Sequence, residues 1–325
     1  MQRYRAPWWL PGGDAQTLWP ALRSGPRNAH GHAAARYQRE RWSTPDGDFI
    51  DVDVQAHAPQ APWLVLFHGL EGSSQSHYAL AFARRAALEG MNFAVPHFRG
   101  CSGALNLAPR AYHSGDFEEV GWILTRLRER AASPLSVVGV SLGGNALLRW
   151  AQESGSLAAH TASSVAAVCS PIDLAAGGHA LGRGFNRISY TPMFLRTMKP
   201  RALAKLAQFP GLFDRHRLLA ARNLFEFDNV FTAPLHGFRD TDDYWARGSA
   251  KPHLHRIRIP ALVLNARNDP FVPAASLPAA AEVGDHVTLW QPAHGGHVGF
   301  PPATQRSDQA ITMPESVLGW LRSHA

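Results

Sequence analysis

The stretch Leu135-Ser-Val-Val-Gly-Val-Ser-Leu-Gly-Gly-Asn145 joins a β-branched run, a G-x-S-x-G motif and the start of an apolar helix. Valine favours strands, and residues 142–153 are rich in alanine and leucine, so the segment predicts a strand, a sharp turn and a helix. Gly139 and Gly143 flank Ser141 where the two backbones come close, and a Cβ at either position would clash. Because this turn lifts the serine hydroxyl off the end of the strand and points a helix N-terminus at the group it attacks, Ser141 is the candidate nucleophile.

Short apolar runs separated by helix-length segments lie on both sides of this motif. Continuous apolar runs of four to seven residues are typical of buried parallel strands joined by crossover helices. The polar and apolar alternation over residues 40–57, around a turn at 45–48, predicts a hairpin at the sheet edge. The other expected strands are 63–67, 93–96, 135–138, 164–168, 261–264 and 286–290, and the expected helices are 78–89, 117–132, 142–153 and 314–322.

The alternation stops between residue 173 and about residue 252, where aromatic, arginine and proline residues are mixed. We expect an α/β fold with a mostly parallel central sheet flanked by helices, in which residues 1–173 and 253–325 form the core and residues 174–252 a helical cap insertion. The cap aromatics are candidates to line an apolar acyl pocket. We expect most of them to pack the cap's own small core, because apolar burial requires no ligand: Phe185, Tyr190, Phe194, Phe209, Phe213, Phe225 and Phe227.

A serine hydroxyl needs a neighbouring base, and the base needs a group that orients it. In parallel-sheet hydrolases these groups follow later strands in the order serine, acid, histidine. Asp269 follows the run 261–264 in a polar turn, and His297 follows the last expected strand after a pair of glycines. Asp173 remains an alternative acid, and His294 an alternative base.

The tetrahedral intermediate of such a reaction needs two N–H donors for its oxygen. The backbone N–H of Leu142, directly after the candidate nucleophile, is one. The N–H of Leu70 is the other, in a loop where Gly69 lets the backbone bend. We expect His68 to anchor this loop rather than to serve as a second base.

Composition excludes several classes of protein. The chain has 325 residues, 45% of them hydrophobic, which suffices for one large core with an insertion. Its two cysteines, Cys101 and Cys169, have no metal-ligand spacing, and Cys101 lacks an elbow, so we expect no disulfide framework, no metal site and no thiol nucleophile. The net charge of +7 comes from scattered arginines and suggests no nucleic-acid partner, only a weak tendency towards anionic substrates or membrane surfaces.

The N-terminal stretch is basic but has no apolar run long enough for a signal peptide, and no segment approaches the roughly 20 apolar residues of a membrane span. We therefore expect a cytoplasmic protein without an integral membrane segment. The sequence does not determine the oligomeric state.

Motifs along most of the chain resemble those of the YheT-like α/β-hydrolases. This resemblance implies an α/β-hydrolase fold with a modest cap, the triad Ser141, Asp269 and His297, and hydrolysis of short-chain or monoacylglycerol-like carboxylic esters. The matching segments are Gln16-Thr-Leu, Pro45-Asp-Gly-Asp-Phe49, Phe67-His-Gly-Leu-Glu-Gly-Ser73, His97-Phe-Arg-Gly-Cys-Ser-Gly103, Tyr112-His-Ser-Gly115, Gly139-Val-Ser-Leu-Gly-Gly-Asn145, Phe225-Glu-Phe-Asp228, Asp269-Pro-Phe271 and His294-Gly-Gly-His-Val-Gly-Phe300.

The sequence therefore predicts a serine hydrolase that cleaves small-molecule esters through an acyl-enzyme, without metal or organic cofactor. Two alternatives stay open. The same triad can transfer the acyl group to an alcohol or thiol, and a module of this fold can bind a ligand without catalysis. An intact serine, acid and histidine argue against the binding module, and a serine at the elbow disfavours epoxide and haloalkane hydrolysis, which use a carboxylate nucleophile there.

Overall fold

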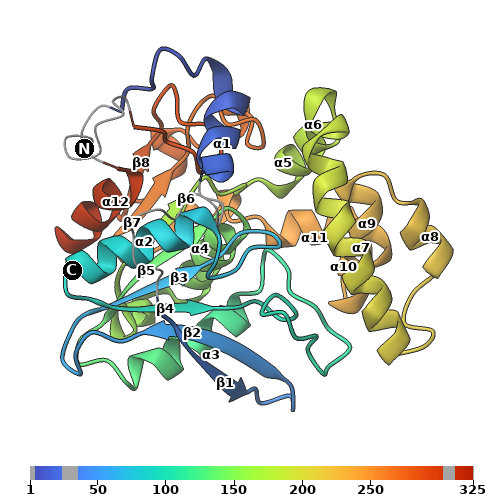
Figure 1. Ribbon diagram of the computed structural model, residues 1–325, viewed down its shortest axis with the longest axis horizontal. Helices are drawn as coiled ribbons and strands as arrows, with labels where there is room; N and C mark the ends of the chain where they lie inside the picture. Colours follow the sequence, from blue (N-terminus) through green and yellow to red (C-terminus); the bar gives the residue numbers. More distant parts are fainter. Residues whose placement is uncertain (1–3, 24–35, 303–311, 325) are drawn as a thin grey trace.

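An eight-stranded sheet forms the centre of the molecule (Figure 1). The computed structural model describes residues 4–23, 36–302 and 312–324, so the first three residues of the basic N-terminal stretch lie outside the described part. The strand order is β1-β2-β4-β3-β5-β6-β7-β8. The strands are β1 (Gln38–Ser43), β2 (Phe49–Gln55), β3 (Trp63–Phe67), β4 (Asn92–Pro96), β5 (Leu135–Val140), β6 (Ala162–Val168), β7 (Ala261–Leu264) and β8 (Val287–Trp290).

The sheet is parallel from β4 to β8, and only β1 and β2 run against their neighbours. The expected edge hairpin and buried parallel strands are therefore confirmed, with strand ends shifted by one or two residues. Burial on both faces explains the continuous apolar runs. In β3, Val65 and Phe67 pack on one side of the sheet, whereas Leu64 and Leu66 pack on the other.

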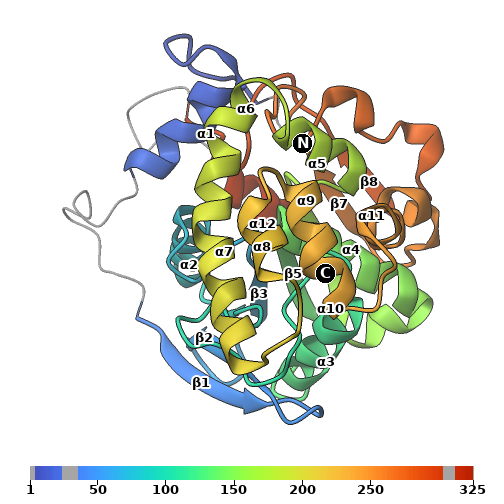
Figure 2. The same ribbon diagram turned by 90° about the vertical axis from the view of Figure 1, so that its right-hand side faces the viewer.

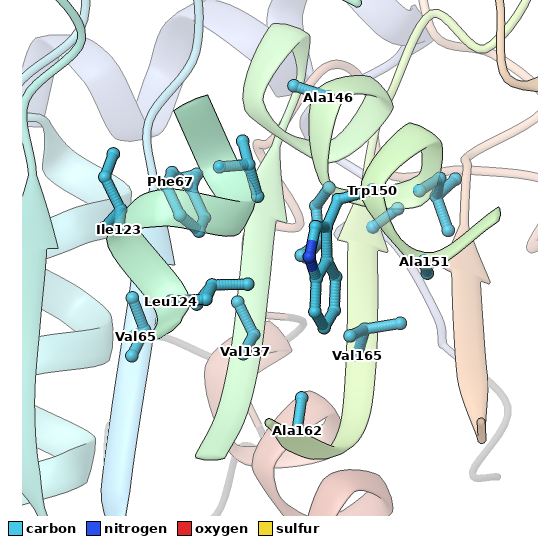
Figure 3. Packing of buried hydrophobic residues seen from close by; sticks show 14 of the residues in the cluster. Val65, Phe67, Ile123, Leu124, Val137, Ala146, Trp150, Ala151, Ala162 and Val165 are labelled. Atoms are coloured by element: carbon cyan, nitrogen blue, oxygen red, sulfur yellow. The ribbon is translucent and has the colours of Figure 1, made fainter. Parts of the chain in front are cut away.

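Helices cover both faces of this sheet. The helices α3 and α4 pack on one face, and α2 and α12 on the opposite face. Figure 3 shows how Trp150 of α4 fills the space above Val137 of β5 and Val165 of β6. The helices outside the insertion are α1 (Gly12–Arg23), α2 (His77–Leu88), α3 (Phe117–Arg128), α4 (Leu142–Ser154) and α12 (Met313–Arg322).

Between β6 and β7 the chain forms a group of helices beyond the carboxyl ends of the strands (Figures 1 and 2). Their position agrees with a helical insertion, and the exact division at residues 174 and 252 stays a prediction. No helix among the described residues is long and apolar enough to cross a membrane. The helices are α5 (Leu174–Leu181), α6 (Gly184–Ile188), α7 (Tyr190–Gln208), α8 (Arg215–Ala220), α9 (Leu224–Val230), α10 (Thr232–Leu235) and α11 (Thr241–Gly248).

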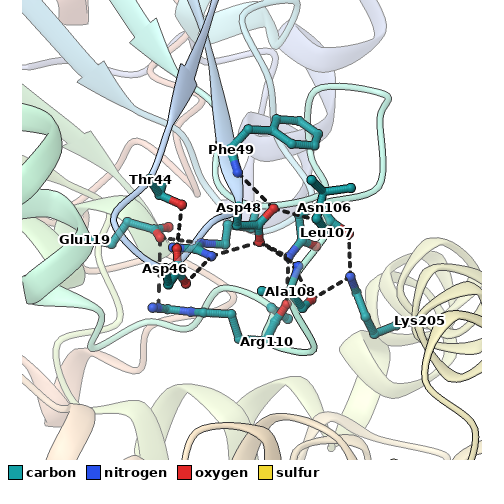
Figure 4. A network of polar contacts seen from close by, with 12 residues as sticks. Thr44, Asp46, Asp48, Phe49, Asn106, Leu107, Ala108, Arg110, Glu119 and Lys205 are labelled. Atoms are coloured by element: carbon teal, nitrogen blue, oxygen red, sulfur yellow. Dashed lines mark hydrogen bonds and ion pairs between the residues drawn. The ribbon is translucent and has the colours of Figure 1, made fainter.

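A buried polar network attaches α7 to the core (Figure 4). Lys205 of α7 donates hydrogen bonds to the carbonyls of Asn106 (2.7 Å) and Ala108 (2.9 Å). Asp48 in turn accepts from the Asn106 side chain (2.7 Å) and from the Leu107 and Ala108 amides. These bonds hold the pKa of Asp48 below its usual value, so the carboxylate stays charged as the hub of the network.

Candidate active site

Ser141 lies in the turn between β5 and α4 with a φ of +53°, a conformation that side chains other than glycine rarely adopt. Its amide donates to the Val168 carbonyl at 2.8 Å, which ties the turn to the neighbouring strand. A Cβ on Gly139 would lie 2.5 Å from the Gly143 oxygen, and a Cβ on Gly143 would lie 2.5 Å from the His68 oxygen. The predicted need for both glycines is therefore confirmed.

The structure brings Ser141, His297 and Asp269 together although they follow three different strands. The His297 Nε2 lies 3.1 Å from the Ser141 Oγ, and its Nδ1 lies 2.9 Å from the Asp269 Oδ2. An ionised carboxylate can only accept hydrogen bonds, so the Nδ1 carries the ring proton. The Nε2 lone pair is then free to accept the Ser141 hydroxyl proton.

The Asp269 carboxylate is held by the turn that contains it. Its Oδ1 accepts from the Phe271 amide at 2.8 Å and the Val272 amide at 3.2 Å, which leaves the Oδ2 for the histidine. The alternative acid Asp173 instead caps α5 by accepting from the Ala176 amide at 3.0 Å. The alternative base, His294, is exposed.

Residues 67–73, here called the oxyanion loop, approach Ser141 from β3. A Cβ on Gly69 would lie 3.1 Å from the Ser141 Cβ, and the Gly69 amide donates to the Tyr78 hydroxyl at 2.9 Å. Leu70 and Leu142 line the same pocket as Ser141. Among the described residues, neither of their backbone amides donates a hydrogen bond, so both are available to a ligand oxygen.

His68 lies behind this loop, fully buried. Its Nδ1 lies 2.8 Å from the Gly69 carbonyl, and its Nε2 accepts from the Phe98 amide at 3.1 Å. Burial lowers the pKa of His68 to about 3, which keeps the ring neutral. Both nitrogens are thus engaged with the backbone, as expected of an anchor.

A family profile described as "alpha/beta hydrolase fold" matches residues 62–303 of the chain, which include β3 to β8 and all three residues of this constellation. The chain belongs to the α/β-hydrolase family. The prediction of this fold and family from the motifs is confirmed.

Two relatives show how far the similarity of this α/β-hydrolase extends. The chain is 38% identical over 292 residues to the protein named "Putative esterase YheT" of Escherichia coli strain K12, covering 88% of the chain and 84% of the relative. It is 27% identical over 303 residues to Phospholipase ABHD3 of Homo sapiens, covering 90% and 72%. The prediction of an enzyme of the hydrolase class is therefore confirmed.

A solved structure of a bacterial membrane phospholipase A, described as a virulence factor, superposes with a TM-score of 0.58. It shares 17% identity with the chain and covers 94% of the chain and 92% of its own length. At this identity the similarity supports the fold alone.

A pocket extends from Ser141 between the core and the inserted helices. Most of its wall is apolar, and the insertion supplies Phe194, Met198, Phe227 and Phe231. Of the seven aromatic residues singled out from the sequence, only Phe194 and Phe227 line this pocket. Four of the seven pack in clusters built mainly from the insertion, namely Phe194, Phe213, Phe225 and Phe227, whereas Phe185 is exposed. The expectation that most of them pack the cap's own core is therefore confirmed.

Three cations also line the pocket. Arg99 and Lys205 are fully engaged with carboxylates or carbonyls of the core and of α7. Arg201 of α7 pairs with Glu71 of the oxyanion loop at 2.7 Å and contacts the Cys101 Sγ at 3.1 Å. Burial raises the pKa of Cys101 to about 12, so its thiol is a poor nucleophile, in line with the expectation.

One group of side chains in the described part of the chain has the spacing of metal ligands: Cys169, Asp269 and His297, whose candidate atoms lie within 4.8 Å of one another. Asp269 and His297 already bond to each other. The Cys169 Sγ accepts from the Val298 amide at 3.2 Å, and burial raises the pKa of the thiol well above its usual value. A metal would require the thiolate, so this chemistry does not favour one, and the expected absence of a metal stays a prediction.

Sequence reasoning missed the side chains that hold these loops. Tyr78 holds the oxyanion loop through the Gly69 amide, and Arg201 holds it through Glu71. Gln16 and Thr17 of α1 contact the loop of His297. The only sequence signal for the last two was their place in a motif shared with the YheT-like family. No local pattern indicates which distant loop such residues contact.

Proposed function

We propose that this α/β-hydrolase cleaves carboxylic esters of small molecules through an acyl-enzyme formed on Ser141. The observation that carries the proposal is the continuous hydrogen-bond path from Asp269 through His297 to Ser141, beside two backbone amides that donate to no described residue. The names of the relatives, an esterase and a phospholipase, support esters as the substrate class.

In the first half-reaction the Ser141 Oγ attacks the ester carbonyl carbon while the His297 Nε2 takes the hydroxyl proton. The Leu70 and Leu142 N–H groups stabilise the oxyanion, and Asp269 stabilises the imidazolium. Collapse of the intermediate breaks the bond to the alkoxy oxygen, and His297 protonates the leaving alcohol. Water then attacks the acyl-enzyme by the same route and releases the acid, so the steps need only these groups and water.

The apolar pocket supports an acyl chain as the group that the enzyme holds beside Ser141. In this proposal residues 174–252 act as a cap that forms the roof of the pocket. Short-chain and monoacylglycerol-like esters are the substrates that fit the proposal. A cytoplasmic location, weak contact with membrane surfaces and the absence of a cofactor stay predictions.

The test uses a fluorophosphonate probe and p-nitrophenyl esters from acetate to palmitate on wild type, Ser141→Ala and the control Ser163→Ala. Ser163 is a half-buried serine on β6 that contacts the Leu135 carbonyl. We expect labelling of wild type and Ser163→Ala only, with ester turnover of Ser141→Ala lower by a factor of about 10⁴ or more. Unchanged turnover in folded Ser141→Ala would refute the mechanism.

Two further outcomes separate the alternatives. Folded wild type that neither labels nor turns over any ester would favour a binding module of the same fold. Acyl transfer to added alcohols or thiols in preference to water would favour an acyltransferase that uses the same serine.

A further inference from the structure

We infer that Gln16 and Thr17 of α1 are positioning residues that hold the loops of the catalytic acid and base in register; the inference rests on the proposed function. Helix α1 lies outside residues 62–303, the part matched by the family profile. Figure 1 shows α1 beside the chain that follows β7 and β8. Residues 294–300 after β8 are here called the base loop.

Thr17 fixes the backbone of the base itself. Its Oγ1 accepts from the His297 amide at 2.8 Å and donates to the Gly13 carbonyl of the same helix at 2.7 Å. The Thr17 hydroxyl thus donates its proton to Gly13, so the oxygen accepts from the His297 amide through a lone pair. Thr17 is buried, so water does not compete readily for this bond.

Gln16 joins the two loops through a single amide. Its Oε1 accepts from the Gly295 amide at 2.8 Å and from the Asn268 Nδ2 at 3.0 Å, while its Nε2 donates to the Leu10 carbonyl at 2.9 Å. The Asn268 Oδ1 closes the circuit by accepting from the Gly296 amide at 3.0 Å. Asn268 directly precedes the acid Asp269, and Gly295 lies two residues before the base His297. By bonding to both, Gln16 fixes the distance between the loop of the acid and the loop of the base.

The backbones of α1 and these loops are in direct contact. A Cβ on Gly13 would collide with the Asn268 carbonyl oxygen, and one on Gly299 with the Gln16 carbonyl oxygen. A Cβ on Gly296 would lie 2.7 Å from the Gly13 oxygen. At these points the backbone of α1 contacts the backbones of both loops without side chains in between. A displacement of α1 would therefore displace both loops.

This arrangement matters because His297 has to meet two partners at once. Ser141 is fixed by its own turn, so the freedom left in the triad is the position of the base loop relative to Asp269 and Ser141. A misplacement of about 1 Å costs about 10² in rate. Loss of the bonds from α1 should therefore lower kcat and leave KM nearly unchanged, because neither Gln16 nor Thr17 lines the pocket.

The experiment compares Thr17→Val and Gln16→Met with two matched controls. Thr125→Val removes the same type of hydroxyl bond to a carbonyl four residues earlier, on the exposed side of α3, and Gln152→Met removes a buried amide that bonds the Ala250 carbonyl. We expect kcat to fall about tenfold to a hundredfold in each α1 variant, with KM within about twofold, and to stay near wild type in the controls. Thr17→Ser keeps the hydroxyl and should restore most of the rate.

A double variant separates positioning from general destabilisation. In a His297→Ala background, Thr17→Val should cause no further loss of residual turnover or of fluorophosphonate labelling, because its effect acts through His297. An equal loss in both backgrounds, or an unchanged kcat in Thr17→Val, would overturn the inference. If Ser141→Ala keeps full turnover, the proposed function fails instead, so the two failures are distinguishable.

Discussion

Two loops meet at Ser141, and different parts of the molecule hold them. The oxyanion loop is tied to α2 through Tyr78 and to α7 through the pair of Glu71 with Arg201. The base loop is tied to α1 through Gln16 and Thr17. In the proposed mechanism, oxyanion stabilisation is thus linked to the inserted helices that line the pocket, and alignment of the base is linked to a helix near the N-terminus. Substitutions that loosen the oxyanion loop and substitutions that loosen the base loop should therefore lower kcat by different amounts and for different reasons.

The largest expected effect lies on the base side. Asp269→Asn should lower kcat by about 10⁴, because an amide that donates to the His297 Nδ1 forces the ring proton onto the Nε2, where it faces Ser141. The oxyanion loop would be intact, so steady-state kinetics should show residual turnover above the uncatalysed rate. Asp173→Asn is the matched control, since asparagine caps a helix as well as aspartate does. A greater loss in the control than in Asp269→Asn would move the acid role to Asp173.

A smaller loss is expected on the oxyanion side. Gly69→Ala would place a Cβ 3.1 Å from the Ser141 Cβ and push the loop away from the nucleophile. Because loss of one oxyanion donor costs about 10²–10³, a displaced donor should cost about 10–10² in kcat. Gly319→Ala on α12 is the control, since a Cβ there meets nothing within 4 Å. Equal kcat values for the two variants would show that this loop does not set the rate.

The pair of Glu71 and Arg201 tests whether the oxyanion loop is linked to α7. Arg201→Met leaves the half-buried Glu71 carboxylate without its cation, so the free energy of unfolding should fall by about 1–3 kcal/mol and kcat by a few-fold. Adding Glu71→Gln should restore much of the stability, as denaturant titration can measure. Arg130→Met breaks the exposed pair with Glu40 and should cost less than about 1 kcal/mol. Similar losses of unfolding free energy in Arg201→Met and Arg130→Met would contradict the proposed link between the oxyanion loop and α7.

The sequence carried enough information for the strands, the elbow and the loops of the triad, because those signals are local. Valine runs, the glycines around Ser141 and the turns after β7 and β8 each act within a few residues. The supports of the two loops carry no such signal. Thr17 and His297 are 280 positions apart, and Arg201 and Glu71 are 130 apart, so only the packed fold brings them into contact.

Prolines in the insertion show a second limit of local reasoning. A proline inside a helix removes a backbone hydrogen bond and usually ends or kinks the helix, yet Pro200 lies inside α7, the longest of the inserted helices. Tertiary contacts of that helix, such as those of Lys205 with the core, offset the hydrogen bond that proline removes.

The smallest effect on activity is expected from the far wall of the pocket. Asp228 accepts from the Trp245 Nε1 at 2.9 Å and from the Thr232 hydroxyl at 2.6 Å, and its burial raises the pKa to about 6. A carboxyl whose pKa is higher in the folded state stabilises the fold at low pH, and this contribution is lost as the pH rises through about 6. Wild type should therefore lose stability between pH 4 and 7 relative to Asp228→Asn, whose amide can donate to Thr232 without titrating.

Chemical denaturation of both proteins at several pH values measures this difference, which should reach about 1–3 kcal/mol at pH 7. Other titrating groups are common to the two proteins and cancel in the comparison. Parallel pH dependences would show that the pKa of Asp228 does not differ between the folded and unfolded states, which would contradict the raised value. An unchanged kcat in Asp228→Asn would show that this wall of the pocket does not affect the position of either loop. A fall in kcat comparable with that of Gly69→Ala would mean that the inserted helices act on the oxyanion loop through contacts other than the one between Arg201 and Glu71.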